Sequence, residues 1–233
     1  VMHRGRTLGD RHAMGQRAEL EWRDGNLPVS TRFDDPYFSI TDGLAETRHV
    51  FLAGNGLPER CVTGFHVAEL GFGTGLNMLA MVLALRESNI PIRFTSFEAF
   101  PMRDDIARAL DAFPEARAVA DPFLAVWDTG ARFFTVGPVT VEVIEGDARE
   151  TLPEWRGMAD AWFLDGFSPA KNPELWPPDL MAEVGRHTAP GGTAATYTAA
   201  GFVRRGLADA GFEVTRQPGF GHKRHMTTAR KAG

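Results

Sequence analysis

The stretch that decides the fold is Glu69-Leu70-Gly71-Phe72-Gly73-Thr74-Gly75-Leu76-Asn77. Residues 65–68, before it, are short, apolar and partly alternating, which is typical of a strand. Apolar side chains recur at helical spacing from Leu76 to Ala84, so the glycines mark a strand-to-helix turn. Glycine permits so tight a turn, and without Cβ atoms a ligand can lie against the backbone, near the free N–H groups of the helix. The stretch predicts a nucleotide-like ligand above the first strand of an α/β sheet.

The glycine spacing distinguishes between two kinds of nucleotide ligand. The dinucleotide fingerprint is G-x-G-x-x-G/A, but here the third glycine, Gly75, comes one residue early and Leu76 stands where Gly or Ala is needed. Glu69 precedes the first glycine by two positions. The resulting E-x-G-x-G-x-G pattern resembles motif I of Rossmann-like S-adenosylmethionine (SAM) methyltransferases. A glycine turn that binds nothing remains an alternative, so the decision depends on the segments that follow.

Composition restricts the class of protein. The 233 residues are 43% hydrophobic and 24% charged, which is ordinary for a globular chain, and the net charge of −5 argues against wholesale wrapping of nucleic acid. The single cysteine, Cys61, cannot form an internal disulfide, and no Cys/His cluster has zinc spacing, so we expect a cytoplasmic protein without a metal. No apolar run has membrane-spanning length. Residues 1–17 are basic and unpatterned at their start, and we expect a disordered leader or a true start near Met14.

An N-terminal extension is expected over residues 18–60. Asp24-Gly25 between two short apolar segments predicts a β-hairpin, and residues 43–51 predict a short helix. Between them lies a stiff loop, in which Asp34, Asp35 and Tyr37 either support the fold or face a cationic, ring-bearing substrate.

Two acidic residues follow predicted strands. Residues 92–97 form a buried strand that ends at Glu98, where Rossmann-type folds bind a ribose. Residues 139–144 form another, followed by Gly146-Asp147, which resembles the adenine-contacting motif of SAM methyltransferases or is a simple turn. Between these strands we expect an amphipathic helix over residues 102–113 and an insertion over residues 114–138 that packs on the domain or covers the active site.

The most distinctive segment is AWFLDGFSPAKNPELW, residues 161–176. Its four apolar residues predict a buried strand beside the first one, which places Asp165 at the topological switch point of the sheet. N-methyltransferases often carry a D/N-P-P-Y/F motif here, whose polar group holds the target amine in line with the methyl group. Asp165 supplies the carboxylate in this sequence, and Phe167, Ser168 and Pro169 supply the wall.

The remaining chain predicts a strand over residues 191–198, a helix over 201–210 and strands over 212–217 and 224–229. Residues 204–231 contain seven Lys or Arg against two Asp or Glu, a basic excess that suits phosphates or forms a solvated face. We therefore expect one domain over residues 61–233, an α/β Rossmann-like methyltransferase fold with a mostly parallel, seven-stranded sheet, helices on both faces and the N-terminal hairpin added.

Taken together, these stretches resemble the tRNA-modifying MnmC/MnmD methyltransferase family over nearly all of residues 20–230. DGFSPAKNPELW and FVRRGL-x-x-AGF are the most specific stretches, while the glycine turn is shared with many methyltransferases. The resemblance implies SAM as cofactor and tRNA as partner, with conversion of 5-aminomethyl-2-thiouridine to 5-methylaminomethyl-2-thiouridine at the wobble position. In bifunctional members an FAD-dependent oxidase domain follows.

The resemblance also implies residue roles. The SAM site would consist of Glu69, Gly71, Phe72, Gly73, Thr74, Gly75, Asn77, Glu98, Asp147 and Asp165. The base would lie against Tyr37, Phe38, Phe167, Lys171, Asn172 and Trp176, although core packing is an alternative for Trp176. Phosphates would contact Arg204, Arg205, Lys223 and Arg224.

Asp165 is the expected catalytic residue, as a base or as a group that orients the amine. Three other functions stay open: an aminopropyl- or methyltransferase acting on a small amine, an NAD-dependent oxidoreductase, and a non-catalytic tRNA-binding subunit. The early third glycine and the Asp165 loop argue against the oxidoreductase, and the basic C-terminal third favours tRNA over a polyamine.

Overall fold

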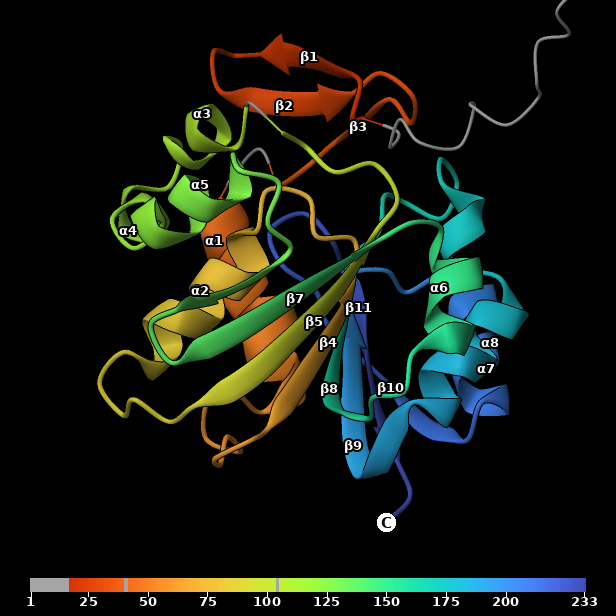
Figure 1. The fold of residues 1–233 in the computed structure, drawn as a ribbon. Helices are drawn as coiled ribbons and strands as arrows, with labels where there is room; N and C mark the ends of the chain where they lie inside the picture. The colour runs from red at the N-terminus through yellow and green to blue at the C-terminus, as the bar shows by residue number, and fades with distance from the viewer. Residues whose placement is uncertain (1–16, 40–41, 104) are drawn as a thin grey trace, which may run out of the picture.

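An eight-stranded sheet runs through the centre of the computed structural model, which describes residues 17–39, 42–103 and 105–233 (Figure 1). The expected leader, residues 1–17, lies almost wholly outside these residues. The strand order is β10-β11-β9-β8-β4-β5-β7-β6. Their bounds are β4 His66–Leu70, β5 Ile92–Glu98, β6 Phe133–Val136, β7 Val139–Glu145, β8 Ala159–Leu164, β9 Thr188–Thr196, β10 Phe212–Pro218 and β11 His225–Lys231.

The five middle strands, from β9 to β7, are parallel to one another. Both faces of a parallel sheet are covered by helices, which explains why β4 is buried at every residue and β8 at all but one, rather than at every second residue. In Figure 1 one face carries α1 to α5 and the other α6 to α8. The helices are α1 Gly43–Thr47, α2 Leu76–Leu85, α3 Ile106–Leu110, α4 Pro114–Arg117, α5 Asp121–Trp127, α6 Ala148–Glu154, α7 Pro178–Arg186 and α8 Gly201–Asp209.

The sheet confirms the expected mostly parallel architecture but has eight strands where we expected seven. The additional strand, β6, comes from the segment that we expected to be an insertion, and it pairs antiparallel with β7 across a turn at Gly137. The sequence did not indicate this strand, because the apolar residues Phe133 and Phe134 suggested a segment that only packs on the domain. In the structure Phe133 is exposed and Phe134 is buried, the alternation expected of an edge strand. The rest of the segment folds as α4 and α5 against α2 and β6.

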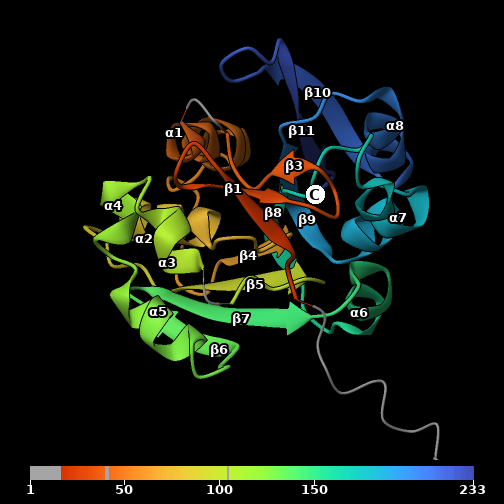
Figure 2. The same cartoon turned by 90° about the horizontal axis from the view of Figure 1, so that it is seen from above.

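The N-terminal extension forms a second, three-stranded sheet. The predicted hairpin is confirmed as β1 Leu20–Arg23 and β2 Leu27–Ser30, and a two-residue strand, β3 Asp35–Pro36, is added to it. Figure 2, which views the molecule from above, shows this sheet crossing over the carboxyl ends of β8, β4 and β5. The Arg108 guanidinium lies 4.0 Å from the centre of the Trp22 ring, fixing the hairpin to α3.

Two predicted helices differ from the observed ones. The helix expected over residues 43–51 is α-helical only as α1, residues 43–47, and continues as a π-helical turn at Arg48–Leu52. Of the helix expected over residues 102–113, only residues 106–110 are helical, as α3. At the start of this segment, the Met102 carbonyl accepts a hydrogen bond from the Trp127 indole at 2.8 Å, which holds it against α5 instead. No helix among the described residues has both the length and the apolar character needed to cross a membrane.

Candidate active site

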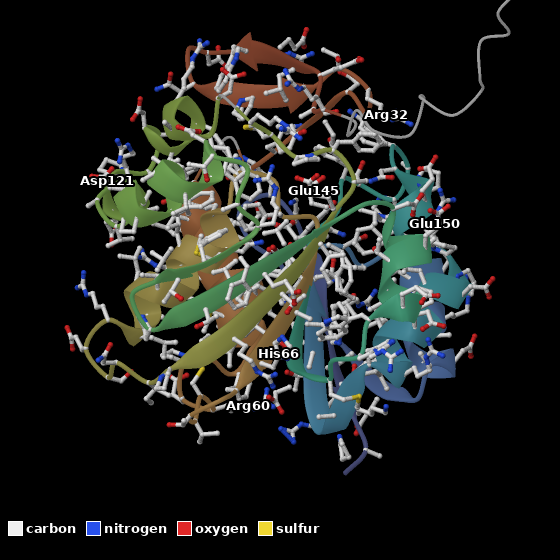
Figure 3. The ribbon with its side chains drawn as sticks, in the orientation of Figure 1. Arg32, Arg60, His66, Asp121, Glu145 and Glu150 are labelled. Atoms are coloured by element: carbon white, nitrogen blue, oxygen red, sulfur yellow. The ribbon has the colours of Figure 1, made fainter. Side chains whose placement is uncertain are left out.

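A cavity of about 1050 Å³ opens at the carboxyl ends of the parallel strands, under the N-terminal sheet. This is where ligands bind in open α/β folds, and the volume is at the upper end of the range for ligand pockets. In Figure 3, Arg32, Glu145 and Glu150, which line the cavity, lie toward this end of the sheet. Arg60 and His66 lie at the opposite end.

The glycine turn lines this cavity and joins β4 to α2, as predicted. Gly71, Gly73 and Gly75 all have positive φ angles, of 91°, 54° and 76°, which L side chains adopt only with strain. A Cβ atom on Gly71 would lie 2.4 Å from the backbone oxygen of Asp165. The turn therefore needs glycine both for its conformation and for the close approach of the Asp165 loop.

Asn77, in the first turn of α2, connects the buried carboxyl group of Glu69 to the partly buried one of Asp165. Its side-chain amide donates to Oε1 of Glu69 at 2.8 Å and to Oδ2 of Asp165 at 2.6 Å, and its oxygen accepts from the Thr47 hydroxyl at 2.7 Å. The Ser96 hydroxyl donates to the second oxygen of Glu69 at 2.6 Å. This network brings the predicted residues Glu69, Asn77 and Asp165 together and fixes their orientation.

Burial perturbs both carboxyl groups. Removal from water raises the pKa of Glu69 to about 8, against the hydrogen bonds from Ser96 and Asn77, which lower it. The pKa of Asp165 is raised to about 7, also by burial, and the Asn77 hydrogen bond opposes this shift. Asp165 therefore exchanges a proton near neutral pH, which suits a group that handles protons.

Glu98 follows β5 as predicted and lines the cavity. One carboxylate oxygen accepts from the Gly73 backbone N–H at 3.0 Å and the other from the Phe100 N–H at 2.7 Å. Burial nevertheless raises its pKa. Each oxygen keeps a further lone pair, so the carboxylate can hold the glycine turn and still accept a hydroxyl group.

Asp147 lines the cavity too, but its carboxylate is engaged by its own helix. It caps α6 by accepting from the Arg149 backbone N–H at 2.9 Å, and it forms an ion pair with the Arg149 guanidinium. This is the turn role that the sequence left open beside adenine binding. The hydrogen bonds from Arg149 lower the pKa of Asp147.

The loop after Asp165 is held by side chains from three other segments. The Tyr197 hydroxyl donates to the Gly166 carbonyl at 2.7 Å, the Trp176 indole to the Phe167 carbonyl at 2.9 Å, and the Ser168 N–H donates to the Asp35 carboxylate at 2.8 Å. Asp35 thus supports this loop. The backbone of the loop is fixed at three successive residues.

An aromatic wall made by Phe33, Tyr37 and Phe167 lines the cavity. The Phe167 ring centre lies 5.0 Å from that of Phe33 and 5.0 Å from that of Tyr37. Phe38 also lines the cavity and packs edge-on against Phe113. Burial raises the pKa of Tyr37, so its phenol stays protonated.

Three expected substrate contacts lie elsewhere. Trp176 is only 1% exposed and supports the loop from below, because its indole needs the Phe167 carbonyl as partner. The Lys171 ammonium pairs with Asp34 and Asp35 outside the cavity. Lys223, expected on a phosphate, lies in the cavity wall 2.7 Å from Glu46.

The other expected substrate residues are divided between the cavity and the surface. Asn172 lines the cavity and is buried. Arg204 and Arg205 are on α8, and Arg224 is exposed just before β11; these three do not line the cavity.

Sequence reasoning missed several polar residues of the site, namely Glu46, Thr47, Ser96 and Tyr197. Tyr197 follows β9, so the rule that placed Asp165 at the end of β8 could have found it. Ser96 lies beside Glu69 in the pairing of β4 with β5, and a polar residue inside a buried strand was its signal. Glu46 and Thr47 gave no comparable signal, because their burial depends on how α1 packs on α2.

Comparison with known proteins fits this geometry. A family model described as S-adenosyl-L-methionine-dependent methyltransferase matches residues 114–232, more than half of the chain. The chain belongs to this family. The matched part of this methyltransferase includes Asp147, Asp165 and the loop after it.

The similar proteins are more specific in name. The methyltransferase is 48% identical over 225 residues to a "tRNA 5-methylaminomethyl-2-thiouridine biosynthesis bifunctional protein MnmC" of Caulobacter vibrioides, over 92% of this chain and 38% of that protein. A protein of the same name from Pseudomonas aeruginosa PAO1 is 44% identical, over 94% and 36%. The chain thus spans little more than a third of the length of these relatives. The crystal structure of MNMC2 from Aquifex aeolicus superposes with a TM-score of 0.73 at 26% identity, over 94% of this chain and 72% of that one. The resemblance to MnmC-type methyltransferases is confirmed.

Proposed function

We propose that this methyltransferase converts 5-aminomethyl-2-thiouridine to 5-methylaminomethyl-2-thiouridine at the wobble position of tRNA. The observation that carries the proposal is the position of Asp165: a partly buried carboxyl group of raised pKa, at the switch point of the sheet, in a cavity with an aromatic wall. The names of the relatives supply the substrate.

The residues present fit SAM. The cavity is large enough for a nucleoside cofactor and a target base, and the glycines leave the backbone of the turn open to a ligand. The methionine end would lie along residues 71–75 beside Glu69 and Asn77, and the ribose hydroxyls would bind Glu98 through its remaining lone pairs. The Asp147 carboxylate already forms an ion pair with Arg149. To bind adenine as well, it would have to accept an additional hydrogen bond. When bound, SAM supplies an electrophilic methyl group on a sulfonium.

The chain's own groups prepare the amine. A primary amine is mostly protonated at neutral pH, and only its free form has the lone pair that attacks a methyl group. Asp165 accepts a hydrogen bond or a proton from the amine, while Asn77 and the fixed backbone of the following loop hold the carboxylate in place. Holding two reacting groups in line contributes several kcal/mol by itself.

The target base enters from the side of the N-terminal sheet. An RNA base that is turned out of its loop is commonly stacked on aromatic side chains, and Tyr37, Phe38 and Phe167 line this side of the cavity. Arg204, Arg205 and Arg224 are exposed or half-buried outside the cavity, where they would contact phosphates.

A second activity must provide the aminomethyl group on the uridine. The relatives are named bifunctional and are much longer than this chain, so we propose that an FAD-dependent oxidase domain or protein supplies the intermediate. The tRNA substrate and the single cysteine both favour the cytoplasm as the place of reaction.

Transfer of a labelled methyl group from SAM to tRNA tests the proposal. The tRNA is taken from a strain that lacks this methylation and is digested to nucleosides after the reaction. Label in 5-methylaminomethyl-2-thiouridine supports the proposal. SAM binding without labelled tRNA rejects the tRNA substrate and favours a small amine, and the same assay with aminopropyl donors and polyamines then identifies the reaction.

A further inference from the structure

The wall of the cavity contains a cation that none of the roles described so far explains. Lys223 lies in the connection between β10 and β11. Its ammonium nitrogen is 2.7 Å from Oε1 of Glu46 and 4.2 Å from the centre of the Tyr197 ring. All three residues line the same cavity as Asp165. A carboxylate and an aromatic face are the two groups that favour an ammonium ion in a partly dehydrated place.

Contacts on both sides fix this arrangement. Glu46 belongs to α1 and its side chain is only 12% exposed. His49, one turn later, lies 3.0 Å from the Pro218 carbonyl through its Nε2 atom, and its ring packs near Phe220, so the β10–β11 connection is held on α1. Tyr197 is anchored to Gly166, the residue after Asp165. Lys223 therefore contacts the loop after Asp165 indirectly, through the Tyr197 ring, and α1 directly, through Glu46.

The other charged groups around Asp165 are acidic. Glu46 acts on it from α1 and Glu69 from β4, and both Glu69 and Asp165 bind the neutral Asn77 amide. Asp35 lies at the Ser168 N–H and Glu98 at the end of β5, and both line the same cavity. Two arginines also line the cavity but are engaged elsewhere: Arg32 lies over the Phe100 ring, and Arg149 pairs with Asp147. In the described part of the chain, Lys223 thus provides the permanent positive charge on this side of the cavity, where the His222 imidazole is its neighbour in the wall.

We propose that Lys223 is a positioning residue of the methyl transfer, which keeps Asp165 ionised for the incoming amine by neutralising the Glu46 carboxylate beside it. The proposal rests on the proposed function, since it assumes that Asp165 serves an amine. Without the ammonium, the carboxylates of Glu46 and Asp165 would still line the same cavity, and a nearby like charge keeps a carboxyl group protonated to a higher pH. The effects on the pKa of Asp165 agree: after burial, Glu46 raises it and Lys223 lowers it.

The test is a direct titration of Asp165 in the free protein, without SAM or tRNA. The protein is labelled with ¹³C at aspartate side-chain carboxyl groups, and the spectrum of Asp165→Asn identifies the resonance. The Lys223 side chain is 47% exposed, so water screens its charge, and we expect Lys223→Met to raise the titration midpoint by about half a pH unit and Lys223→Arg to leave it near that of the wild type. Glu46→Gln should lower the midpoint, because the ammonium is then free to act on Asp165.

Two further variants make the result specific. The double variant Glu46→Gln with Lys223→Met removes both charges and should return the midpoint toward the wild-type value, which a merely structural role would not do. Arg230→Met removes a cation from β11 near its far end and should not move the midpoint. Equal midpoints in the wild type and Lys223→Met, in a protein whose spectrum shows that it is folded, would overturn the proposal, as would a higher midpoint in Glu46→Gln.

The acidic limb of kcat/KM for methyl transfer should move in the same directions. Because the titration needs no substrate, failure to methylate tRNA would reject the proposed function and leave the titration result intact. Fixed midpoints together with normal methylation would reject only the role of Lys223.

Discussion

The side-chain amide nitrogen of Asn77 lies 2.6 Å from Oδ2 of Asp165, and so joins the first turn of α2 to the residue that follows β8. The same amide group binds Glu69. One side chain therefore orients two carboxyl groups that would repel each other when ionised, and both hydrogen bonds are formed before any ligand enters.

Replacing Asp165 by Asn should lower turnover at least about a hundredfold, as is typical when an acid–base group is lost. SAM should still bind, because most of its expected contacts lie on the glycine turn and Glu98. Single-turnover methyl transfer and calorimetric titration with SAM measure the two effects. Asp160→Asn, at the other end of β8, is the control and should keep nearly normal turnover; near-normal turnover of Asp165→Asn itself would remove Asp165 from the mechanism.

Replacing Glu98 by Gln should weaken SAM binding about tenfold or more. The new amide turns a donor toward the N–H of Gly73 or Phe100, and a hydrogen bond to a charged acceptor is worth about 1.5–3 kcal/mol. Glu145, its neighbour on β7, is the matched control, and Glu145→Gln should have a much smaller effect. Equal affinities of the two variants would contradict a ribose role for Glu98.

Replacing Glu69 by Gln should make stability less dependent on pH. The usual carboxyl pKa is near 4.5, whereas in the folded protein that of Glu69 is about 8, so the folded state keeps a proton that the unfolded chain has lost. This contribution is fully present below the usual value and is lost as the pH rises toward 8, at up to about 1.4 kcal/mol per pH unit. Urea unfolding from pH 5 to pH 8 should show the variant gaining stability relative to the wild type; parallel curves would mean that Glu69 is ionised throughout.

Replacing Gly71 by Ala should destabilise the fold more than replacing Gly25 by Ala. Both have a positive φ, which costs an Ala about 1–2 kcal/mol. Around Gly25 an added Cβ meets nothing within 4 Å, whereas at Gly71 it collides with the Asp165 backbone. The difference should be about 1–3 kcal/mol, measured as free energies of unfolding in denaturant. If the two costs are equal, the approach of the loop to the turn is looser than described.

Replacing Trp176 by Phe should reduce stability without changing the KM for tRNA. The variant loses the hydrogen bond to the Phe167 carbonyl, at about 1–3 kcal/mol, but no surface of the cavity. Tyr37→Ala, on the aromatic wall, is the contrasting variant and should raise that KM. A raised KM in Trp176→Phe, with normal stability, would restore Trp176 as a contact of the base.

The outcome for Trp176 illustrates what could be predicted from the sequence. The glycine turn and strand pattern indicated that Glu98 and Asp165 would lie at one cavity and Glu69 beneath it, because residues at the carboxyl ends of parallel strands must meet there. The partners of Trp176, Lys171 and Lys223 could not be predicted, because the direction of a side chain depends on groups such as Phe167, Asp34 and Glu46, whose positions the sequence alone does not give. β6 was not predicted for a similar reason. A short edge strand is defined by its pairing with a neighbouring strand, here β7, and a four-residue apolar sequence does not indicate that pairing by itself.

The position of β11 has a consequence for the order in which the protein is assembled. This strand follows β10 in the chain but lies between β9 and β10 in the sheet. While a ribosome is still making residues 225–231, β9 has no partner on that side and β10 has nothing to pair with. The connection that carries Lys223 then has no second strand to hold it beside α1. β10 and the connection that carries Lys223 can therefore join the sheet only after residues 225–231 have been made.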